Sequence, residues 1–396
     1  MRIIATNTDK ISPFIGGIMR VCVTLARQWV KQGHDVLFVS ANDKNVPNPH
    51  LIDFRQVVLP DGMNHQSEAN YNAFLQTVQD FKADVILHPF VHDESYTDMC
   101  LSIRKNTGTR LVLAWHFAPT HYWNVMDRNF FIPMQMKASF LRAVYDVPFW
   151  LRWNGYRKQQ VIKRTKSYFL RCIAESDSFV MLSALQMHDF EKLVGKHTNK
   201  LVAINNPITF DAPSQIDYAR KEKHVLWMGR IGYDMKRTDK MLNIWKRISR
   251  KYLDWRLIVC GPGETADFAA WCKKNGMTNV DFPGVVQVED YYQRASILCN
   301  TSVTEGWGMV LVEAMQYGCV PMAFDSYRNV HDIIVNGETG YVIPAFDEDV
   351  YAAKLGELIE NAQLRQQMAE AGRVSLTRFD KSLIAEQWIR LFNQLR

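Results

Sequence analysis

Residues 2–33, RIIATNTDKISPFIGGIMRVCVTLARQWVKQG, decide the fold. The segment opens with a short apolar run at 2–6, passes through a loop with two glycines and then repeats apolar residues at helical spacing. The residues expected on one helical face are Ile18, Val21, Cys22, Leu25, Ala26, Trp29 and Val30. Gly33 is a typical helix stop. The segment therefore predicts a strand, a turn and an amphipathic helix, which together begin an α/β unit.

Short apolar runs continue to alternate with helix-period segments after this opening. In the first half of the chain the runs are 35–41, 84–90, 110–117 and 178–184. Apolar strands separated by helices are typical of a parallel sheet that is covered on both faces. A polar, proline-containing stretch at 205–223 interrupts the pattern, which resumes with runs at 224–231, 255–263, 280–286, 296–302, 320–324 and 339–344. Because 396 residues are more than a single hydrophobic core usually contains, we expect two doubly wound α/β domains in tandem.

Composition and charge favour a folded protein with an anionic ligand. The chain is 47% hydrophobic and 22% charged, and its net charge of +6 suits a phosphate-bearing ligand or an anionic membrane surface. It carries no nucleic-acid-binding motif, so nucleic acid is not an expected partner. The seven cysteines are widely spaced and form no C-x-x-C pair, which favours reduced core thiols in a cytoplasmic protein over a zinc site. The N-terminus resembles no secretory signal, and no window approaches the ~18 apolar residues of a membrane span, so any membrane contact is expected to be peripheral.

Two glutamates lie near the start of an expected helix in residues 304–321, TEGWGMVLVEAMQYGCVP. The helix is expected to begin near Gly308, with Glu305 on the preceding loop and Glu313 about one and a half turns inside. Either glutamate alone could be a surface residue or a partner of the helix dipole. As a pair beside a helix N-terminus, they suggest a ligand that offers hydroxyl groups at both ends.

The start of this helix predicts a phosphate site. The backbone amides of Met309 and Val310 would lie at the positive end of the helix dipole, where phosphate oxygens bind. Carboxylates are poor phosphate ligands but good acceptors for sugar hydroxyls. A sugar–diphosphate–ribose therefore fits the segment, with Glu305 at the sugar and Glu313 at the ribose.

Two cations follow the first strand of the second half, in WMGRIGYDMKRTD. Arg230 comes directly after the buried run and Lys236 lies six residues later, at the head of the next helix. Arginine offers bidentate contacts and lysine a mobile point charge, so the two suit a pyrophosphate. The alternative is a solvated charge pair.

Three weaker signals follow other strands. Gly16 and Gly17 would let a phosphate approach a helix N-terminus, although a plain turn explains them equally well. IVCGPGETA at 258–266, with Asp281 further on, partly matches a dinucleotide fingerprint, but a turn beside the ligand site is the favoured interpretation. His116 ends a strand, where it could polarise a hydroxyl or serve only a structural role.

Together these motifs resemble the retaining glycosyltransferases of the GT-B type, family 4, with its paired-glutamate motif. The resemblance covers nearly the whole chain. Its elements, in order, are Gly16–Gly17, His116, INNP, GR at 229–230, Lys236, GPGE, TEGWGMVLVEAM and VNGETGYVIP. It implies two Rossmann-like domains facing across a cleft: an acceptor-side domain at 1–205 and a nucleotide-sugar-binding domain at 206–379. The helix expected at 380–396 would pack back on the first domain.

The resemblance also implies a role for each matching residue. The residues implied in catalysis are Glu305, His116, Arg230 and Lys236. Those implied in donor binding are Gly16, Gly17, Arg230, Lys236, Gly306, Trp307, Gly308, Met309, Val310 and Glu313. Such enzymes need neither metal nor cofactor, because cations and a helix dipole stabilise the departing diphosphate. They retain the anomeric configuration by same-face attack, and a nucleophilic role for Glu305 is the alternative mechanism.

The implied reaction moves a hexose from a nucleotide sugar, with a UDP-sugar favoured, to a glycan or lipid-linked acceptor in cell-surface polysaccharide or lipopolysaccharide synthesis. Two other functions stay open. One is a sugar-nucleotide epimerase on the same scaffold, and the other is a non-catalytic nucleotide-binding or NAD-dependent protein built on GPGETA.

Residues 147–172 depart from the family layout. They hold seven Lys and Arg, no acidic residue and several interleaved aromatics. Such a surface could bind an anionic acceptor or the inner face of the plasma membrane. A solvated helical face with ordinary core aromatics is the competing interpretation. The cations are Arg152, Arg157, Lys158, Lys163, Arg164, Lys166 and Arg171, and the aromatics are Phe149, Trp150, Trp153, Tyr156, Tyr168 and Phe169.

Overall fold

The computed structural model describes residues 1–12, 16–43, 54–119 and 140–395. The chain forms two compact units. The first comprises Met1–Phe117, Arg164–Thr209 and the C-terminal residues from Arg378, and the second comprises Phe210–Thr377 with the described part of Ala118–Lys163.

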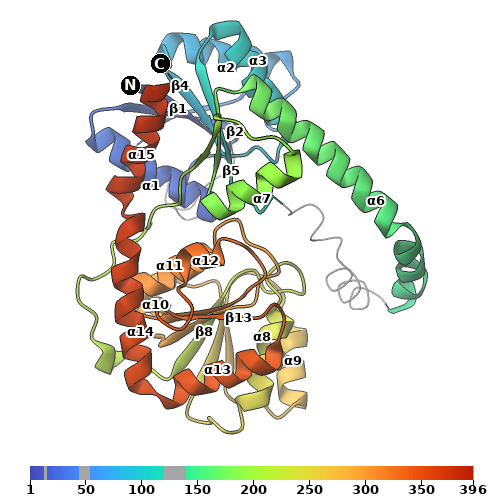
Figure 1. The fold of residues 1–396 in the computed structure, drawn as a ribbon, viewed down its shortest axis with the longest axis vertical. Helices are drawn as coiled ribbons and strands as arrows, with labels where there is room; N and C mark the ends of the chain where they lie inside the picture. The colour runs from blue at the N-terminus through green and yellow to red at the C-terminus, as the bar shows by residue number, and fades with distance from the viewer. Residues whose placement is uncertain (13–15, 44–53, 120–139, 396) are drawn as a thin grey trace. The chain divides into compact units, whose positions relative to one another are not determined.

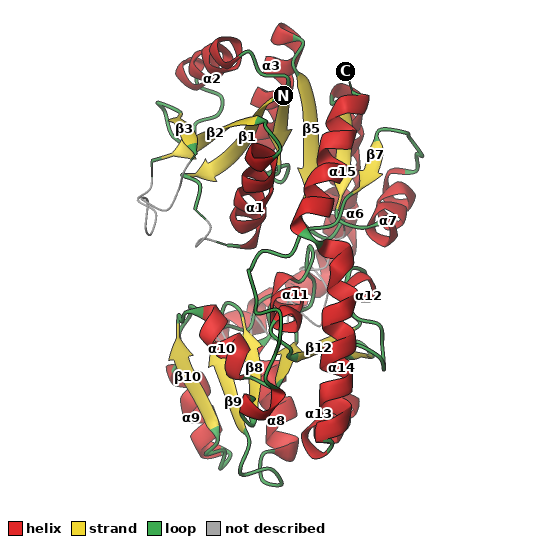
Figure 2. Cartoon of the chain, turned by 90° about the vertical axis from the view of Figure 1, so that its left-hand side faces the viewer, coloured by secondary structure: helices red, strands yellow, loops and turns green. Residues whose placement is uncertain are grey.

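A parallel sheet of seven strands forms the centre of the first unit (Figures 1 and 2). Its strands are β1 (Arg2–Asp9), β2 (Asp35–Asn42), β3 (Arg55–Val58), β4 (Val85–His88), β5 (Arg110–Trp115), β6 (Ser178–Met181) and β7 (Leu201–Ala203). Its helices are α1 (Gly17–Lys31), α2 (Glu68–Phe81), α3 (Glu94–Thr107), α7 (Ala184–Val194) and α15 (Lys381–Gln394), together with the part of α6 (Phe140–Glu175) that follows Lys163. The spatial order β3-β2-β1-β4-β5-β6-β7 reverses direction between β1 and β4. Doubly wound sheets bind ligands beyond the carboxyl ends of the strands at such a reversal.

Helix α1 follows β1 as the opening segment predicts. It begins after Gly16, whose φ of +68° is in the left-handed region that glycine adopts without strain. Most of the expected apolar face is buried, but Val30 is 48% exposed and Met19 is buried in addition. The buried face of α1 therefore differs slightly from the expected one. Trp29 explains part of this difference, because its indole N–H donates to the carbonyl of Ala385 at 3.2 Å. Helix α15 thus lies against α1 (Figure 1).

The second unit is built on a parallel sheet of six strands (Figure 2). Its strands are β8 (His224–Met228), β9 (Arg256–Cys260), β10 (Val280–Gly284), β11 (Ile297–Asn300), β12 (Val320–Phe324) and β13 (Tyr341–Ile343). Its helices are α8 (Thr238–Ile248), α9 (Ala266–Lys274), α10 (Val288–Arg294), α11 (Met309–Gln316), α12 (Val330–Ile333), α13 (Glu348–Glu360) and α14 (Ala362–Ser375). The order β10-β9-β8-β11-β12-β13 reverses between β8 and β11. The sequence prediction of two doubly wound parallel units is confirmed.

The two strands that the sequence did not predict are β3 and β7. They have four and three residues and are largely half-exposed, so neither carries a long apolar run. Each lies at an edge of the first sheet and forms by pairing with one neighbour.

All seven cysteines are free and buried, as expected of core thiols. Burial raises the pKa of the Cys22 thiol to about 12, so that it stays protonated. Among the described residues, no helix is long and apolar enough to cross a membrane.

Helix α6 has two parts that differ in burial, although a single surface was expected from the sequence. Tyr168 and Phe169 are 6% and 0% exposed, and Phe169 packs edge-on against Trp115, so these aromatics belong to the core of the first unit. Arg164 and Arg171 form ion pairs with Glu94 and Asp98 of α3. The expectation that all of 147–172 forms one basic, aromatic surface is therefore wrong for the C-terminal part of the helix.

The N-terminal part of α6 keeps its exposed cations. Between Arg152 and Arg164 no described side chain is buried, and Tyr156 is 63% exposed. Arg152, Arg157 and Lys163 are exposed, and Lys158 is half-buried. Phe149, Trp150 and Trp153 lie outside the residues whose side chains are described.

Candidate functional site

The predicted site residues of the second unit meet at the point where its strand order reverses. Arg230 and Lys236 follow β8, and Glu305 follows the neighbouring strand β11. The ammonium Nζ of Lys236 lies 2.5 Å from Oε1 of Glu305. Residues 69 positions apart in the sequence thus form an ion pair at the carboxyl edge of the sheet. Ligands bind at this edge in open α/β sheets.

Three donors converge on one oxygen of Glu305. Besides Lys236, the hydroxyl of Ser302 donates to Oε1 at 2.7 Å and the amide of Asn300 at 3.3 Å. Among the described residues none donates to Oε2, which leaves that oxygen for a ligand. Burial raises the pKa of this carboxyl, but the Lys236 ammonium and the two neutral donors outweigh burial and hold the pKa below its usual value. Glu305 is therefore ionised at neutral pH.

A short network fixes the loop that carries Lys236. The hydroxyl of Thr301 donates to the carbonyls of Lys236 and Arg237, and it accepts from the indole N–H of Trp227 at 2.9 Å. The N–H of Val303 adds a hydrogen bond to the carbonyl of Met235 at 2.8 Å. These contacts hold the loops after β8 and β11 together, so the ion pair is preorganised. These short polar residues form no recognisable spacing, so the sequence alone does not single them out.

Arg230 stands apart from this network. Its side chain is exposed, and among the described residues it has no ion-pair or hydrogen-bond partner. An arginine directly after a buried strand that is not neutralised by the protein can neutralise a bound anion. The alternative that both cations are merely solvated is wrong for Lys236, because Lys236 forms an ion pair with Glu305. Arg230 is exposed to solvent, as that alternative expects.

Helix α11 begins where the sequence predicts. Gly308 is its N-cap, with φ of +97°, and no side chain caps the helix. Glu313 is 3% exposed, and its Oε2 accepts the hydroxyl proton of Tyr292 at 2.9 Å. The carboxylate expected at the ribose is thus held inside the unit by a tyrosine of α10, and the surface-glutamate alternative is wrong. Gly306, Trp307, Met309 and Val310 lie in the same turn, with Trp307 only 3% exposed.

The GPG turn after β9 packs against the loop that holds Arg230. A Cβ on Gly261 would lie 1.9 Å from the carbonyl oxygen of Gly229, and one on Gly263 would lie 2.3 Å from that of Ile231. The N–H of Ile231 donates to the carbonyl of Pro262 at 2.8 Å. The glycines therefore admit neighbouring backbone, which explains this motif without a dinucleotide.

The other predicted site residues belong to the first unit. Gly17 begins α1, and a Cβ on Gly16 would meet nothing within 4 Å. His116 follows β5 and is 9% exposed. Burial and the neighbouring His92 lower the pKa of His116 to about 4, so this ring is neutral at pH 7. A neutral ring can donate or accept a hydrogen bond but carries no charge. No hydrogen bond joins His116 to either glycine among the described residues.

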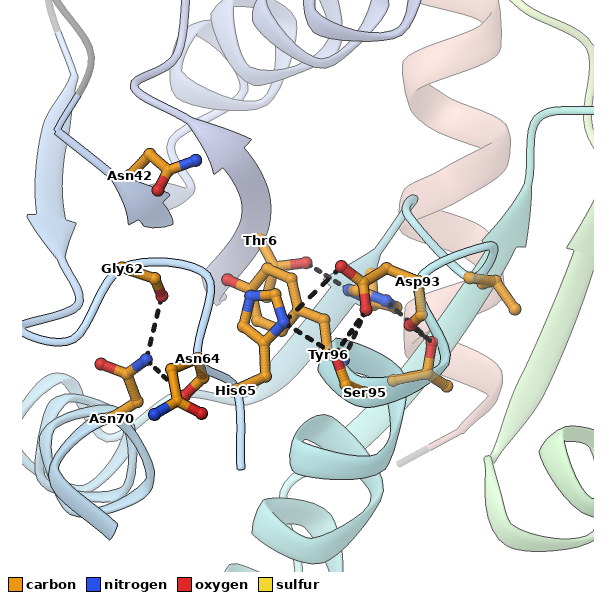
Figure 3. Close-up of polar contacts among 12 residues, drawn as sticks. Thr6, Asn42, Gly62, Asn64, His65, Asn70, Asp93, Ser95 and Tyr96 are labelled. Atoms are coloured by element: carbon orange, nitrogen blue, oxygen red, sulfur yellow. Dashed lines mark hydrogen bonds and ion pairs between the residues drawn. The ribbon is translucent and has the colours of Figure 1, made fainter. Parts of the chain in front are cut away.

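A polar network lies beside β1 and β4 in the same unit (Figure 3). His65 stacks on Tyr96 with ring centroids 4.3 Å apart, and its Nδ1 lies 3.0 Å from the Ser95 hydroxyl. Asp93 caps α3 by accepting from the N–H of Tyr96 at 3.0 Å. The hydroxyl of Tyr96 donates to the carbonyl of Val39 at 3.0 Å, so the network ties α3 to the sheet. Within the described part of the chain, no three His, Cys, Asp or Glu side chains cluster as metal ligands would.

Two family models together match most of the chain. The model of Glycosyltransferase Family 4 matches residues 15–211, and that of Glycosyl transferases group 1 matches residues 211–375. The chain belongs to the family 4 glycosyltransferases of the GT-B type. In this family 4 chain the group 1 match contains the ion pair of Lys236 and Glu305, and the other match contains Gly16, Gly17 and His116.

Curated relatives align with about half of this family 4 chain. The amylovoran biosynthesis glycosyltransferase AmsD of Erwinia amylovora is 31% identical over 180 residues, which are 44% of this chain and 50% of the relative. The phosphatidyl-myo-inositol mannosyltransferase of Mycobacterium tuberculosis is 28% identical over 197 residues, 46% of this chain and 50% of that protein. The chain thus spans about half the length of the curated relatives it matches.

Solved structures share the GT-B fold over the full length. HepE of Anabaena, crystallised with UDP and glucose, superposes with a TM-score of 0.72 at 16% identity and covers 99% of both chains. Sucrose-phosphate synthase of Thermosynechococcus elongatus superposes with a TM-score of 0.75 at 15% identity, covering 100% of this chain and 99% of that one. At these identities the likeness shows the fold alone.

Proposed function

We propose that this protein is a retaining hexosyltransferase that uses a nucleoside-diphosphate sugar, with UDP as the favoured base. The observation that carries the proposal is the ion pair of Lys236 and Glu305 beside the uncapped N-terminus of α11. Cationic groups and helix amides neutralise a departing diphosphate, and a carboxylate oxygen without a donor binds sugar hydroxyls. Arg230 supplies a second cation on the same loop as Lys236, between β8 and α8.

The geometry favours a binding role for Glu305 over a nucleophilic one. Lys236, Ser302 and Asn300 all bind Oε1, and these contacts stabilise the negative charge of the carboxylate. A carboxylate stabilised in this way is a weaker nucleophile. Same-face attack by the acceptor, without a covalent enzyme intermediate, therefore agrees better with this site. His116, as a neutral ring, would hydrogen-bond to the donor sugar.

We also propose that the transfer needs no metal ion or cofactor. Arg230, Lys236 and the N-terminus of α11 would supply the positive charge that a metal supplies in other glycosyltransferases. Activity that survives an excess of EDTA would support this proposal, and activity restored only by added Mg²⁺ or Mn²⁺ would contradict it.

The proposed acceptor is a glycan or a lipid-linked saccharide in cell-surface polysaccharide or lipopolysaccharide assembly. The names of relatives support this class, since they include an amylovoran biosynthesis enzyme and a phosphatidyl-myo-inositol mannosyltransferase. The exposed basic part of α6 offers a surface for anionic lipid, where Lys and Arg contribute about 1 kcal/mol each. Peripheral contact with the inner face of the plasma membrane is part of the same proposal.

Ligand binding tests the proposed donor class. Thermal-shift and calorimetric titrations with UDP, GDP and ADP, and with their hexose conjugates, should reveal one preferred nucleotide. Glu305→Gln should weaken binding of the sugar conjugate more than binding of the free diphosphate, because in this proposal the carboxylate binds the sugar. Absence of binding by any of the three nucleotides would contradict the proposal.

The stereochemistry of the product tests the proposed mechanism. An α-linked nucleotide hexose should give an α-linked product, as NMR of the purified product would show. A β-linked product would contradict retention but leave the donor class intact.

A further inference from the structure

Two loops at the carboxyl edge of the second sheet are joined on either side of Tyr327. The hydroxyl of Ser326 donates to the carbonyl of Ser302 at 2.6 Å, and the side-chain amide of Asn329 donates to the carbonyl of Gly306. The loop after β12 is thus fastened to the loop that carries Glu305. Tyr327 lies between these two contacts and is 6% exposed.

The hydroxyl of Tyr327 is buried and has no hydrogen-bond partner among the described residues. The hydroxyl of Thr304, directly before Glu305, is likewise buried and has no hydrogen-bond partner among the described residues. A buried hydroxyl without a partner costs about 1–3 kcal/mol of stability. In the ligand-free chain Tyr327 therefore carries a cost that phenylalanine would avoid.

The unpaired hydroxyl points at the start of α11. A Cβ placed on Gly308 would lie 3.2 Å from the Tyr327 hydroxyl and 3.3 Å from a methyl carbon of Leu311. Gly308 is the N-cap of α11 and has no capping side chain. Glycine at this position thus makes room for the tyrosine hydroxyl as well as for the φ of +97°. The helix N-terminus and the hydroxyl converge on one point, and Glu305 lies close enough to affect the titration of Tyr327.

We propose that Tyr327 binds the donor: its hydroxyl donates a hydrogen bond to a phosphate oxygen of the nucleotide held at the N-terminus of α11. This inference rests on the proposed function and adds a binding residue to the same site. The position of the contact is the start of α11, where the hydroxyl lies 3.2 Å from a Cβ built on Gly308. The bound phosphate then satisfies the buried hydroxyl, and the hydroxyl supplements the helix dipole.

Tyr327→Phe tests the proposal through two readouts, thermal stability and nucleotide affinity, of which only the affinity should fall. The melting temperature of the ligand-free variant should stay the same or rise, because the variant loses only an unpaired buried hydroxyl. Its dissociation constant for UDP, or for whichever of UDP, GDP and ADP the unmodified chain binds, should rise about tenfold, because a hydrogen bond to a charged group is lost.

Tyr252→Phe is the matched control. Tyr252 lies before β9, on the side of the sheet where the strands begin, and its hydroxyl donates to Glu360 at 2.7 Å. This variant should melt at a lower temperature and bind the nucleotide as the unmodified chain does.

Each outcome of the test decides between the proposals. Unchanged nucleotide affinity in Tyr327→Phe overturns the role of Tyr327 and leaves the proposed function standing. A lower melting temperature with unchanged affinity would make Tyr327 structural. If the unmodified chain binds none of the three nucleotides, the proposed function fails, and the role of Tyr327 fails with it.

Discussion

Glu305 keeps its charge in a largely enclosed position because its neighbours donate to it. The side chain is 13% exposed, and Lys236, Ser302 and Asn300 bind a single oxygen. The motif spacing predicted Glu305 and Lys236 from the sequence alone. It could not predict Ser302 or Thr301, since a single hydroxyl residue at a strand end occurs in most loops and only the folded chain brings it to the carboxylate.

At the residue scale, Ser302→Ala should shift the acidic limb of the pH–activity profile. The Ser302 hydroxyl helps to hold the pKa of Glu305 below its usual value, so its removal should raise that pKa. Activity that needs ionised Glu305 should then be lost at a higher pH as the solution is acidified. The measurement is donor turnover between pH 3.5 and 7 (roughly the range in which carboxyl groups titrate).

Ser296→Ala is the control for this shift. Its hydroxyl donates to the carbonyl of Glu222 at 2.6 Å, at the amino end of β11. The control should keep the profile of the unmodified chain. An unshifted acidic limb in Ser302→Ala would show that Glu305 does not limit activity in acid.

At the scale of elements, the site is built by loops after neighbouring parallel strands. The sequence predicted the strands with long apolar runs, but not β3 or β7, which depend on pairing with their neighbours. The sequence also predicted the start of α11 from its glycine. It did not predict that the GPG turn packs on the loop after β8, because that contact joins segments about thirty residues apart through backbone atoms.

This packing predicts a large effect of Gly261→Ala. The added Cβ would overlap the carbonyl of Gly229, and the backbone at Gly261 has φ of +137°. We expect a loss of about 2–4 kcal/mol in the free energy of unfolding of the second unit, and weaker nucleotide binding as the Arg230 loop shifts. Gly284→Ala is the control, because its φ is +76° but a Cβ there meets nothing within 4 Å. It should cost only about 1 kcal/mol. Equal losses in denaturant unfolding would contradict the packing argument.

Helix α6 carries a second prediction at this scale. Reversal of Arg157, Lys158 and Lys163 to Glu should lower affinity for anionic vesicles at least about a hundredfold, because each cation contributes about 1 kcal/mol. Reversal of Arg250, Lys273 and Lys274, which are exposed on the second unit, should have a much smaller effect. Vesicle sedimentation at two salt concentrations measures both. Binding that persists in the α6 variant would contradict the membrane proposal.

At the scale of the whole molecule, two doubly wound units carry different parts of the predicted site. The alternation of apolar runs and helical segments was enough to predict both sheets. It could not predict which aromatics of α6 enter the core, since Tyr156 and Tyr168 look alike in sequence but are 63% and 6% exposed. Among its described residues the first unit also buries the uncharged histidines His88 and His116, and no sequence pattern showed their burial.

These histidines predict that the first unit loses stability in mild acid. Burial lowers the pKa of His88 to about 3 and that of His116 to about 4, whereas both titrate near pH 6.5 when unfolded. The unfolded chain therefore binds more protons below pH 6.5, and stability falls as the pH drops towards the folded pKa values. Between pH 7 and pH 5 each histidine should cost about 2 kcal/mol.

Hydrogen exchange of the β4 and β5 amides at pH 7 and pH 5, corrected for intrinsic exchange rates, measures this loss. His116→Gln should reduce the loss by about 2 kcal/mol. A first unit that is equally stable at both pH values would show that the histidines are accessible to protons without unfolding.

Release of nucleoside diphosphate from a nucleotide hexose tests the central claim most directly. Purified chain should release UDP, or the nucleotide that it binds best, from the matching sugar conjugate as the hexose passes to an acceptor hydroxyl or to water. Lys236→Ala should lower the rate by about 10²–10³-fold while circular dichroism stays unchanged, because the departing diphosphate loses its fixed cation. Equal rates in the two proteins would contradict the account, since the contact of Lys236 with Glu305 would then have no part in the reaction.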